Sequence, residues 1–345
     1  MRVPSRRSFT ASRWLICGLA LFSGWTPLAA APHVAAVGMT VSDLDRSVAF
    51  FTGVLDFREV GERVELAGSE FEHLTGVFGA RARVATVCLA GECLELTDYL
   101  APEGRPIPAD SRSNDRWFQH VAIVVSDMPR AYARLQAAGV EHVSTAPQRL
   151  PDWNPAAGGI VAFYFRDADE HNLELIAYPA GKGDPRWQAK EKLFLGIDHT
   201  AIAVADTARS LAFWRDAVGF TVAGGAENWG PEQEHLNQVF GARLAITGLR
   251  GAPKEGVPGI GLEFLDYLAP SNGRPAPGDL AANDLAHWYV RLESEDPGKL
   301  AAGARTAGGR WISPGAVVLP SSATGYRTGA LLRDPDGHGL LLTAP

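Results

Sequence analysis

Four segments of the chain alternate between small or polar positions and bulky apolar positions before they pass into helical spacing. They open at Ala36, His120, His199 and His287. Successive side chains of a strand point to opposite faces, so each segment predicts a strand with one bulky apolar face and one open face. We expect the bulky face to pack under the following helix. The small or polar face, which includes the opening residue, is expected to line a groove or cup.

The start of the following helix is marked by an aspartate in three of the four segments. Asp43, Asp127 and Asp206 each stand seven residues after the opening position. At that place a carboxylate accepts a hydrogen bond from a free backbone N–H group of the first helical turn. Each helical pattern is followed by further short strands and a final apolar strand. The sequence therefore predicts a strand–helix–strands module that occurs four times.

The modules are arranged as a duplicated half. The stretch LELTDYLAPEGRPIPAD at 94–110 returns as LEFLDYLAPSNGRPAPGD at 262–279, and EHLTGVFGARARV at 72–84 returns as EHLNQVFGARLAI at 234–246. Repeats that keep their order indicate one structural unit used more than once. We predict a linker at 181–195, where Pro and Gly cluster. The predicted halves are 33–180, with modules at about 33–100 and 116–178, and 196–345, with modules at about 196–268 and 284–345.

Three of the closing strands carry a carboxylate between apolar neighbours. These residues are Glu95, Glu174 and Glu263, whereas the fourth closing strand has Leu341 at the same place. An unpaired buried charge is costly, so each glutamate is expected to be solvated, paired or bound to a metal. Together with the opening histidines they offer nitrogen and oxygen donors. The pattern predicts a divalent metal ion as cofactor and leaves its identity open among Zn, Ni, Co, Mn and Fe.

The segments DHTAIAVADTARSLAFW, QHVAIVVSDMPRAY and VGMTVSDLDRSVAFFTGVLDF, with the closures DADEHNLELI and DPDGHGLLL, resemble the vicinal oxygen chelate superfamily. This superfamily includes glyoxalase I, bleomycin-resistance proteins and extradiol dioxygenases. The resemblance implies an α+β fold of four βαβββ modules in two tandem halves, whose curved mixed sheets form cup-shaped sites. It also implies metal ligands from the opening residue and the closing glutamate of two modules. The implied positions are Ala36 and Glu95, His120 and Glu174, His199 and Glu263, and His287 and Leu341.

Which modules share a cup is left open by the sequence. If the second and third modules pair, the metal ligands are His120, Glu174, His199 and Glu263, a set similar to that of glyoxalase I. In that case Glu95 and His287 would be the remaining ligands of a possible second metal site. We favour this arrangement because it collects both departures from the ligand pattern in one cup.

If instead neighbouring modules within each half pair, two other ligand sets result. One is Glu95, His120 and Glu174. The other is His199, Glu263 and His287, which is similar to the two-histidine, one-carboxylate triad of iron oxygenases.

Three functions follow from these alternatives. In the glyoxalase-like case either Glu174 or Glu263 leaves the metal and transfers a proton, so the protein is an isomerase or lyase acting on a small oxygen-bearing substrate. In the dioxygenase-like case Fe(II) takes a catechol and O₂. In the third case the cup binds a small molecule without catalysis, as in the bleomycin-resistance branch. His235 and its repeat partner His73 could supply an acid or base beside the metal ligands, or they pin a short loop.

Composition and the first residues limit the partners. The net charge is −7 and no basic patch stands out, which argues against binding of nucleic acid or of an anionic membrane surface. Residues 1–31 combine charged residues, a short apolar run and a small-residue cleavage site, and the Arg6-Arg7 pair resembles a twin-arginine signal. We therefore expect a periplasmic or secreted protein without a stable membrane anchor, either a monomer with internal pseudo-symmetry or a homodimer. Cys88 and Cys93 flank a predicted two-residue turn and form either a disulfide or two free thiols.

Overall fold

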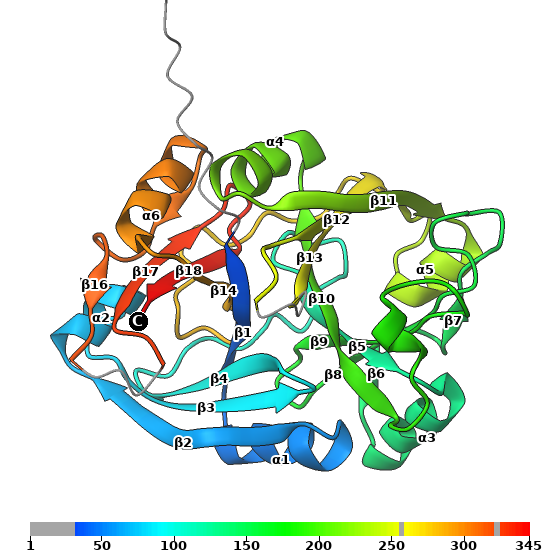
Figure 1. Cartoon of the computed structure of the whole chain (residues 1–345), viewed down its shortest axis with the longest axis horizontal. Helices are drawn as coiled ribbons and strands as arrows, with labels where there is room; N and C mark the ends of the chain where they lie inside the picture. The colour runs from blue at the N-terminus through cyan, green and yellow to red at the C-terminus, as the bar shows by residue number, and fades with distance from the viewer. Residues whose placement is uncertain (1–31, 255–258, 321–324) are drawn as a thin grey trace, which may run out of the picture.

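The computed structural model describes residues 32–254, 259–320 and 325–345, and the predicted signal segment 1–31 lies outside the described residues. The chain forms two mixed sheets of nine strands each, with few helices (Figure 1). Each sheet combines two modules. This architecture confirms the predicted α+β fold with two tandem halves and curved mixed sheets.

The four modules follow one another along the chain. The first comprises β1 (His33–Val41), α1 (Leu44–Val54), β2 (Arg58–Ala67), α2 (Ser69–Thr75), β3 (Arg81–Leu89) and β4 (Glu92–Ala101). The second comprises β5 (Gln119–Val125), α3 (Met128–Ala138), β6 (Glu141–His142), β7 (Gln148–Arg149), β8 (Val161–Arg166) and β9 (Asn172–Ala177). A short 3₁₀ helix, η1 (Pro185–Gln188), lies in the segment that links the halves.

The second half repeats this order. The third module comprises β10 (Phe194–Val204), α4 (Thr207–Leu211), the π-helix η2 (Ala212–Ala217), β11 (Thr221–Trp229), α5 (Pro231–Asn237), β12 (Arg243–Arg250) and β13 (Gly261–Ala269). The fourth comprises β14 (Trp288–Glu293), α6 (Pro297–Thr306), β15 (Arg310–Trp311), β16 (Val317–Val318), β17 (Thr328–Arg333) and β18 (Gly339–Ala344).

The sheets pair the modules in a nested way. Sheet A has the strand order β15-β17-β18-β14-β1-β4-β3-β2 with β16 beside β17, so it joins the first and fourth modules. Sheet B has the order β11-β12-β13-β10-β5-β9-β8-β6 with β7 beside β8, so it joins the second and third modules. In both sheets the two modules meet at an antiparallel pair of opening strands, β1 with β14 and β10 with β5.

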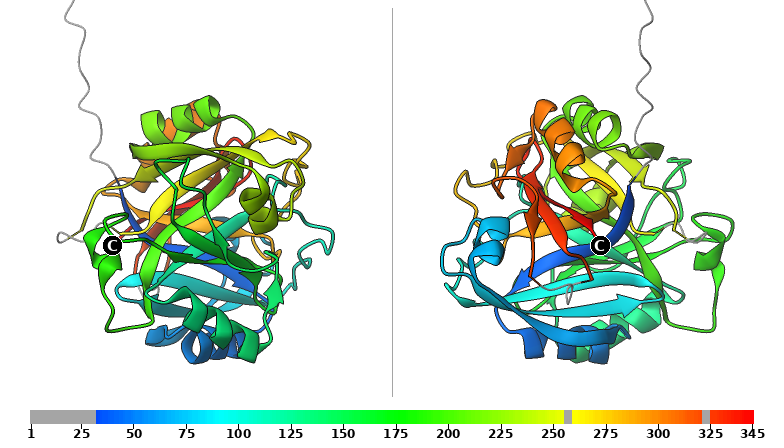
Figure 2. Two further views of the ribbon diagram at one scale, coloured as in Figure 1. Left: turned by 90° about the vertical axis from the view of Figure 1, so that its right-hand side faces the viewer. Right: turned by 60° about the vertical axis from the view of Figure 1, so that its left-hand side comes forward.

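The bulky faces of both sheets and the helices share one apolar core. Val37 and Met39 of β1 and Val121 and Ile123 of β5 belong to it, and none of the four is exposed. In Figures 1 and 2, α1 and α3 lie together at one end of the molecule, and α4 and α6 lie at the other end. The open faces of the strands are therefore left free to line cavities. None of the described helices is long and apolar enough to cross a membrane.

The predicted caps begin the helices. Asp43, Asp127 and Asp206 have extended backbones, and each side chain accepts a hydrogen bond from the N–H three residues later. This satisfies one of the donors that a helix start leaves free.

The caps also correct the alignment of the fourth module. Here the N-cap is Asp296, which accepts from Lys299 N. It follows Tyr289 by seven residues, as Asp127 follows His120. Tyr289, and not His287, is therefore the counterpart of His120.

The strand register agrees with this correction. In sheet B, Ala122 of β5 lies opposite Glu174 of β9. In sheet A, Arg291 of β14 lies opposite Leu341 of β18. Ala122 and Arg291 each stand two residues after the opening position defined by the cap. His287 thus precedes its expected place by two residues, although it keeps the same strand face.

Two further contacts hold the modules in place. Arg274, in the linker after β13, pairs with the buried Asp115 at 2.6 Å. Arg105, in the linker after β4, makes the equivalent 2.6 Å pair with Asp284.

Cys88 and Cys93 lie opposite each other on β3 and β4 and form a disulfide next to the turn at 90–91. The sequence had left a disulfide and free thiols as equal alternatives.

Candidate metal centre

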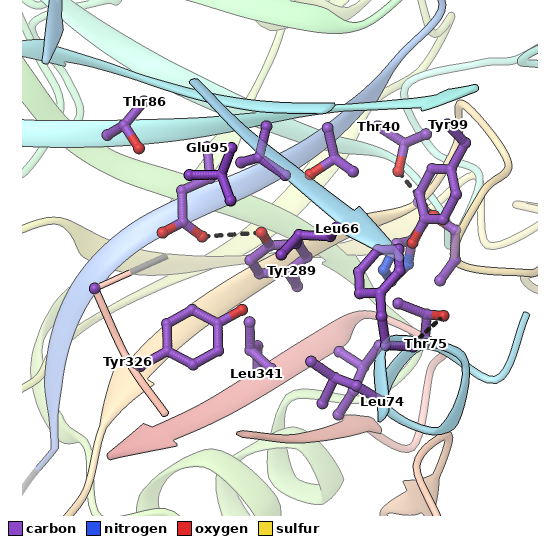
Figure 3. Close-up of a pocket in the computed structure, with 18 of the residues that line it drawn as sticks. Thr40, Leu66, Leu74, Thr75, Thr86, Glu95, Tyr99, Tyr289, Tyr326 and Leu341 are labelled. Carbon is purple, nitrogen blue, oxygen red and sulfur yellow. Dashed lines mark hydrogen bonds between the residues drawn. The ribbon is translucent and has the colours of Figure 1, made fainter. Parts of the chain in front are cut away.

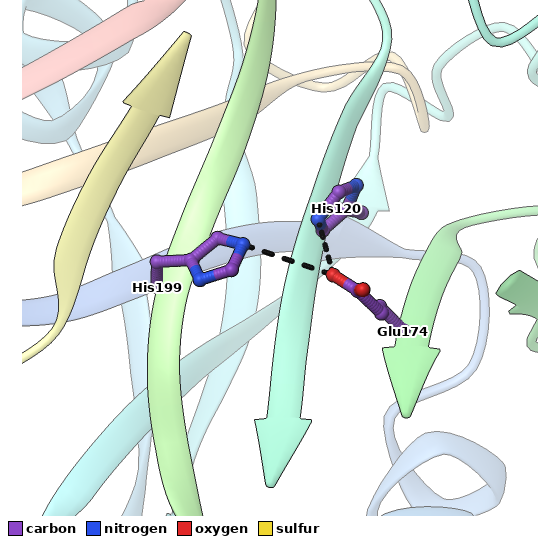
Figure 4. A group of neighbouring side chains, drawn as sticks. All are labelled: His120, Glu174 and His199. Atoms are coloured by element: carbon purple, nitrogen blue, oxygen red, sulfur yellow. Dashed lines mark ion pairs between the residues drawn. The ribbon is translucent and has the colours of Figure 1, made fainter. Parts of the chain in front are cut away.

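Four neighbouring strands of sheet B each direct one potential metal ligand to the same side. His199 lies on β10 and His120 on β5, and these central strands are flanked by β13 with Glu263 and β9 with Glu174. Glu174 Oε2 lies 3.0 Å from His120 Nε2 and 3.7 Å from His199 Nε2. Glu263 Oε2 lies 3.5 Å from His199 Nε2. Figure 4 shows Glu174 reaching toward both imidazoles.

The strand register explains why these side chains converge. Ala201 of β10 lies opposite both Glu263 and His120. One row further along, Ala122 of β5 lies opposite both His199 and Glu174. Each row thus places a methyl group between two ligating side chains. Since both alanines are small, the ligands of the two rows can lean toward a common centre.

The site leaves polar atoms that a metal ion would satisfy. His120 is fully buried, and neither of its ring nitrogens has a hydrogen-bond partner among the described residues. His199 Nε2 is also buried without one. Buried polar groups are rarely left unpaired because desolvation is costly. His120, Glu174 and His199 each offer a ligand atom within 4.8 Å of the others, which fits a divalent ion.

A buried carboxylate orients His199 from behind. Asp198 Oδ2 lies 2.8 Å from His199 Nδ1. Asp198 itself accepts hydrogen bonds from Trp187 Nε1 at 3.1 Å, Tyr178 OH at 3.1 Å and Arg250 Nη2 at 2.9 Å. A carboxylate at Nδ1 favours the tautomer whose Nε2 lone pair faces the site, which is the usual support of a metal-bound histidine.

The charges around His199 hold a proton on it when no metal is bound. Burial alone lowers the pKa of His199, but the carboxylates of Glu263, Asp198 and Glu174 raise it to about 9. Burial also acts to raise the pKa of Asp198, yet His199 and Arg250 hold it well below its usual range. Burial raises the pKa of Glu263, and His199 opposes that rise. A metal ion therefore has to displace a proton to reach Nε2.

The ligands open into a cavity of about 270 Å³. Glu174, His199 and Glu263 line one side, and Gln233 lines another. Gln233 is 2% exposed, and its Oε1 has no hydrogen-bond partner among the described residues, so it is available to a ligand hydroxyl. The stretch Ala223–Ala226 and Gly248 add little bulk, and this leaves room for a substrate.

The remaining predicted residues lie elsewhere. Glu95 and His287 line a separate cavity in sheet A. Because the second and third modules share a sheet, neither the set Glu95, His120 and Glu174 nor the set His199, Glu263 and His287 is brought together. Within the described ranges, one group of three or more His, Cys, Asp or Glu side chains lies close enough together to hold an ion. It consists of His120, Glu174 and His199.

His73 and His235, the two candidates for an acid or base beside the ligands, lie away from the site. His73 and His235 are exposed, in the last turns of α2 and α5. Neither is among the residues that line the two cavities.

The sequence reasoning missed the supporting residues. Asp198 stands directly before His199, and this adjacency was the one local signal. Trp187, Tyr178 and Arg250 come from three other segments, and Gln233 comes from α5, so no spacing along the chain links them to the site.

Comparisons with known proteins agree with the fold. The family model described as the glyoxalase/bleomycin resistance protein/dioxygenase superfamily matches residues 31–175 and 196–342. A 2-epi-5-epi-valiolone epimerase from Actinomyces sp is 35% identical over 149 residues, which are 42% of this chain and 79% of that protein.

Two solved structures resemble the whole chain in fold. Glyoxalase I from Zea mays gives a TM-score of 0.58 at 17% identity and covers 91% of this chain and 92% of its own. A proposed dioxygenase from Bacillus subtilis gives a TM-score of 0.53 at 14% identity, with 92% and 86% covered.

Proposed function

This chain belongs to the glyoxalase/bleomycin resistance protein/dioxygenase superfamily, and from that premise we propose that it is a divalent-metal-dependent isomerase. It moves a proton on a small substrate that carries neighbouring oxygen atoms. The observation that carries the proposal is the convergence of two histidines and two carboxylates beside a cavity that His199, Glu174 and Glu263 line, with one carboxylate outside the tightest group. That arrangement supplies both a metal site and a proton carrier.

His120, Glu174 and His199 would hold the ion. Their donor atoms are buried and mutually close, and His120 and His199 have ring nitrogens without a hydrogen-bond partner in the part of the chain that the structure describes. When bound there, a divalent ion acts as a Lewis acid on substrate oxygen and stabilises the negative charge that develops during proton removal.

Glu263 is the proton carrier in this proposal. Its side chain is 23% exposed, against 6% for Glu174, and it borders the cavity. It is also outside the group of three that lies within mutual ligand distance. Burial raises its pKa, which makes a carboxylate a better base near neutral pH. The sequence had offered Glu174 and Glu263 equally, and this geometry favours Glu174 as ligand and Glu263 as base.

The cavity is suited to a hydroxylated substrate. Gln233 Oε1 can accept a hydrogen bond from a hydroxyl group. Tyr164 and Tyr178 also line the cavity. Burial raises the pKa of both phenols, so both stay protonated. Tyr178 donates its hydroxyl proton to Asp198, which leaves Tyr164 as the phenol that can donate to a substrate. We therefore take cyclic polyhydroxy ketones as the first substrate class, and this choice agrees with the epimerase named among the relatives.

The test is deuterium exchange at carbon. The metal-loaded full chain is incubated with 2-epi-5-epi-valiolone in D₂O, and loss of the exchangeable C–H signal is followed by proton NMR. Removing a general base lowers the rate by about 10²–10⁴-fold, so Glu263→Gln should lose at least 100-fold while keeping the metal. Glu227→Gln, on an exposed ion pair of β11, is the matched control and should keep the wild-type rate.

The outcomes separate the alternatives. Exchange that survives Glu263→Gln refutes the base, and a metal-loaded wild type that exchanges none of a panel of cyclic hydroxy ketones refutes the isomerase. Iron content together with O₂ uptake on catechol would instead support the dioxygenase, and ligand binding without turnover would support a binding protein.

We also propose that residues 1–31 direct export to the periplasm or the medium. The combination of an arginine pair, an apolar run and small residues supports this. N-terminal sequencing of protein recovered from the periplasm or medium of the producing cells should find a start near Pro32, and recovery of the uncut chain from the cytoplasm alone would refute it.

A further inference from the structure

Sheet A contains a second cup of the same size that lacks the ligand set. Its cavity also measures about 270 Å³. By the corrected register, its four ligand positions hold Ala36, Glu95, Tyr289 and Leu341. Three of these residues cannot replace the histidine or carboxylate found in sheet B. The cup is nevertheless preserved as a cavity, which raises the question of what it binds.

An arginine balances the charge of the closing glutamate beside this cup. Ala36 lies opposite Arg291, where sheet B has His199 opposite Ala122, so the large and small side chains have exchanged strands. Arg291 Nε lies 2.9 Å from Glu95 Oε1, and Tyr289 OH donates to Glu95 Oε2 at 2.9 Å (Figure 3). The charge of Glu95 is thus balanced within the protein, and no cation is needed.

The walls of the cup are mostly apolar and aromatic. The apolar and aromatic wall residues labelled in Figure 3 include Leu66, Leu74, Tyr99, Tyr326 and Leu341. Arg291 is not among the lining residues, so its positive charge lies behind Glu95 and does not face the cavity. Glu62 also lines the cavity, but it is exposed, so water screens its charge. Such a lining favours an uncharged ligand, because a net charge would lose its hydration without gaining a buried partner.

A few polar groups remain available to a ligand. Glu95 Oε2 accepts one bond from Tyr289 and can accept another, and the hydroxyls of Thr86 and Thr97 border the cavity. His287 lines the cavity, is 2% exposed, and has an Nδ1 without a hydrogen-bond partner among the described residues. Burial, reinforced by Arg333, lowers its pKa well below the usual range, so the imidazole is neutral.

We propose that the sheet A cup is a second, metal-free binding site for an uncharged organic molecule with an aromatic or alicyclic body and a hydroxyl group. The body packs against the apolar wall, and the hydroxyl donates to Glu95. An apolar cavity of about 150 Å³ accepts benzene, so this cup takes a body of roughly two rings. The site is independent of the isomerase proposed for sheet B.

The experiment uses 2-naphthol as probe and one matched pair of variants. Val84 on β3 and Ile246 on β12 occupy equivalent places in the repeated stretches, and each lines its own cup. Val84→Trp fills the sheet A cup and Ile246→Trp fills the sheet B cup. Calorimetric titration of the metal-free full chain should find one 2-naphthol site, at least tenfold weaker in Val84→Trp and unchanged in Ile246→Trp.

Charge selectivity provides the second readout. The anion 2-naphthoate and the cation 2-naphthylmethylammonium should each bind at least tenfold more weakly than 2-naphthol. In Glu95→Gln, which keeps the shape of the cup but leaves Arg291 unbalanced, the preference should shift toward 2-naphthoate. Glu95→Gln tests the proposal even if the Val84→Trp protein does not fold.

Three results would overturn the assignment. They are the absence of saturable binding, loss of binding in Ile246→Trp instead of Val84→Trp, or tighter binding of either charged probe by the wild type. Because the titration needs neither metal nor turnover, its failure leaves the proposed isomerase untouched.

Discussion

Replacing Asp198 with asparagine should change the number of protons that leave the site when a divalent metal ion binds. In the metal-free protein the carboxylates near His199 raise its pKa to about 9. At pH 7.5 nearly every copy therefore carries the proton, and metal binding at Nε2 releases about one proton. Asp198→Asn removes the charge 2.8 Å from Nδ1, while burial still lowers the pKa. The pKa of His199 should then fall, although Glu263 and Glu174 still raise it, and metal binding should release fewer protons than in the wild type.

The same change should weaken metal binding more at high pH than at low pH. Above pH 9 His199 is neutral in both proteins, and loss of the supporting carboxylate should weaken binding by about 10–100-fold. Between pH 9 and 6.5 the metal affinity of the wild type falls about tenfold for each unit by which the pH is lowered, because the proton competes with the metal for His199. A lower pKa of His199 weakens that competition in the variant, so its disadvantage should shrink as the pH falls.

The proton on His199 also affects the metal-free fold. Because its folded pKa is raised, its stabilising contribution is complete below about pH 6.5 and is lost as the pH rises through about 9. The unfolding free energy of the metal-free protein should therefore decline over the window in which metal affinity increases.

Calorimetry in buffers with different ionisation enthalpies gives the number of released protons directly. The control is Asp167→Asn, which alters a second buried pair, Asp167 Oδ2 with His171 Nδ1 at 2.9 Å, outside the metal centre. It should release as many protons as the wild type. If Asp198→Asn also released the wild-type number, the explanation of the raised pKa would be wrong.

Three further predictions concern metal binding and stability. His120→Ala and His199→Ala should each lower metal affinity by more than tenfold in equilibrium dialysis, whereas His287→Ala should keep one ion, because it lies in the other sheet; loss of the ion in His287→Ala alone would contradict the assigned site. Arg274→Ala should lower the unfolding free energy by about 2 kcal/mol in urea, because it removes a charged partner from fully buried Asp115; a loss below about 0.5 kcal/mol would contradict this. Replacing both Cys88 and Cys93 with alanine should lower the unfolding free energy by about 2 kcal/mol, as closure of so short a loop predicts, without changing metal content; a change in metal content would show that the hairpin supports the site.

Local patterns in the sequence were sufficient to predict the modules and the faces of their strands. The alternation after His120 and His199 is a property of consecutive residues, and so is the cap at Asp127, so both could be read without knowledge of the fold. The pairing of modules could not be read in this way. It depends on β1 meeting β14 and β10 meeting β5, and neither contact leaves a periodic signal.

The error at the fourth module has a specific cause. His287 was aligned with His120 and His199 because those histidines open two earlier segments. However, no aspartate follows His287 by seven residues. Asp296 does follow Tyr289 at that spacing, and it was the better guide because a helix cap is fixed by backbone geometry. A ligand position can lose its side chain during divergence, whereas the helix still has to begin.

The nested arrangement of the sheets sets the order in which the chain can complete them. The last strand that sheet B needs ends at Ala269, so that sheet can close while the fourth module is still being made. Sheet A has to wait for β14 and β18. Until then β1 has β4 on one side and an open apolar edge on the other, and such an edge can template aggregation. Contacts this distant in sequence also slow folding. Synthesis of the C-terminal module is therefore the step that covers this edge, and chains truncated after β13 should aggregate through β1.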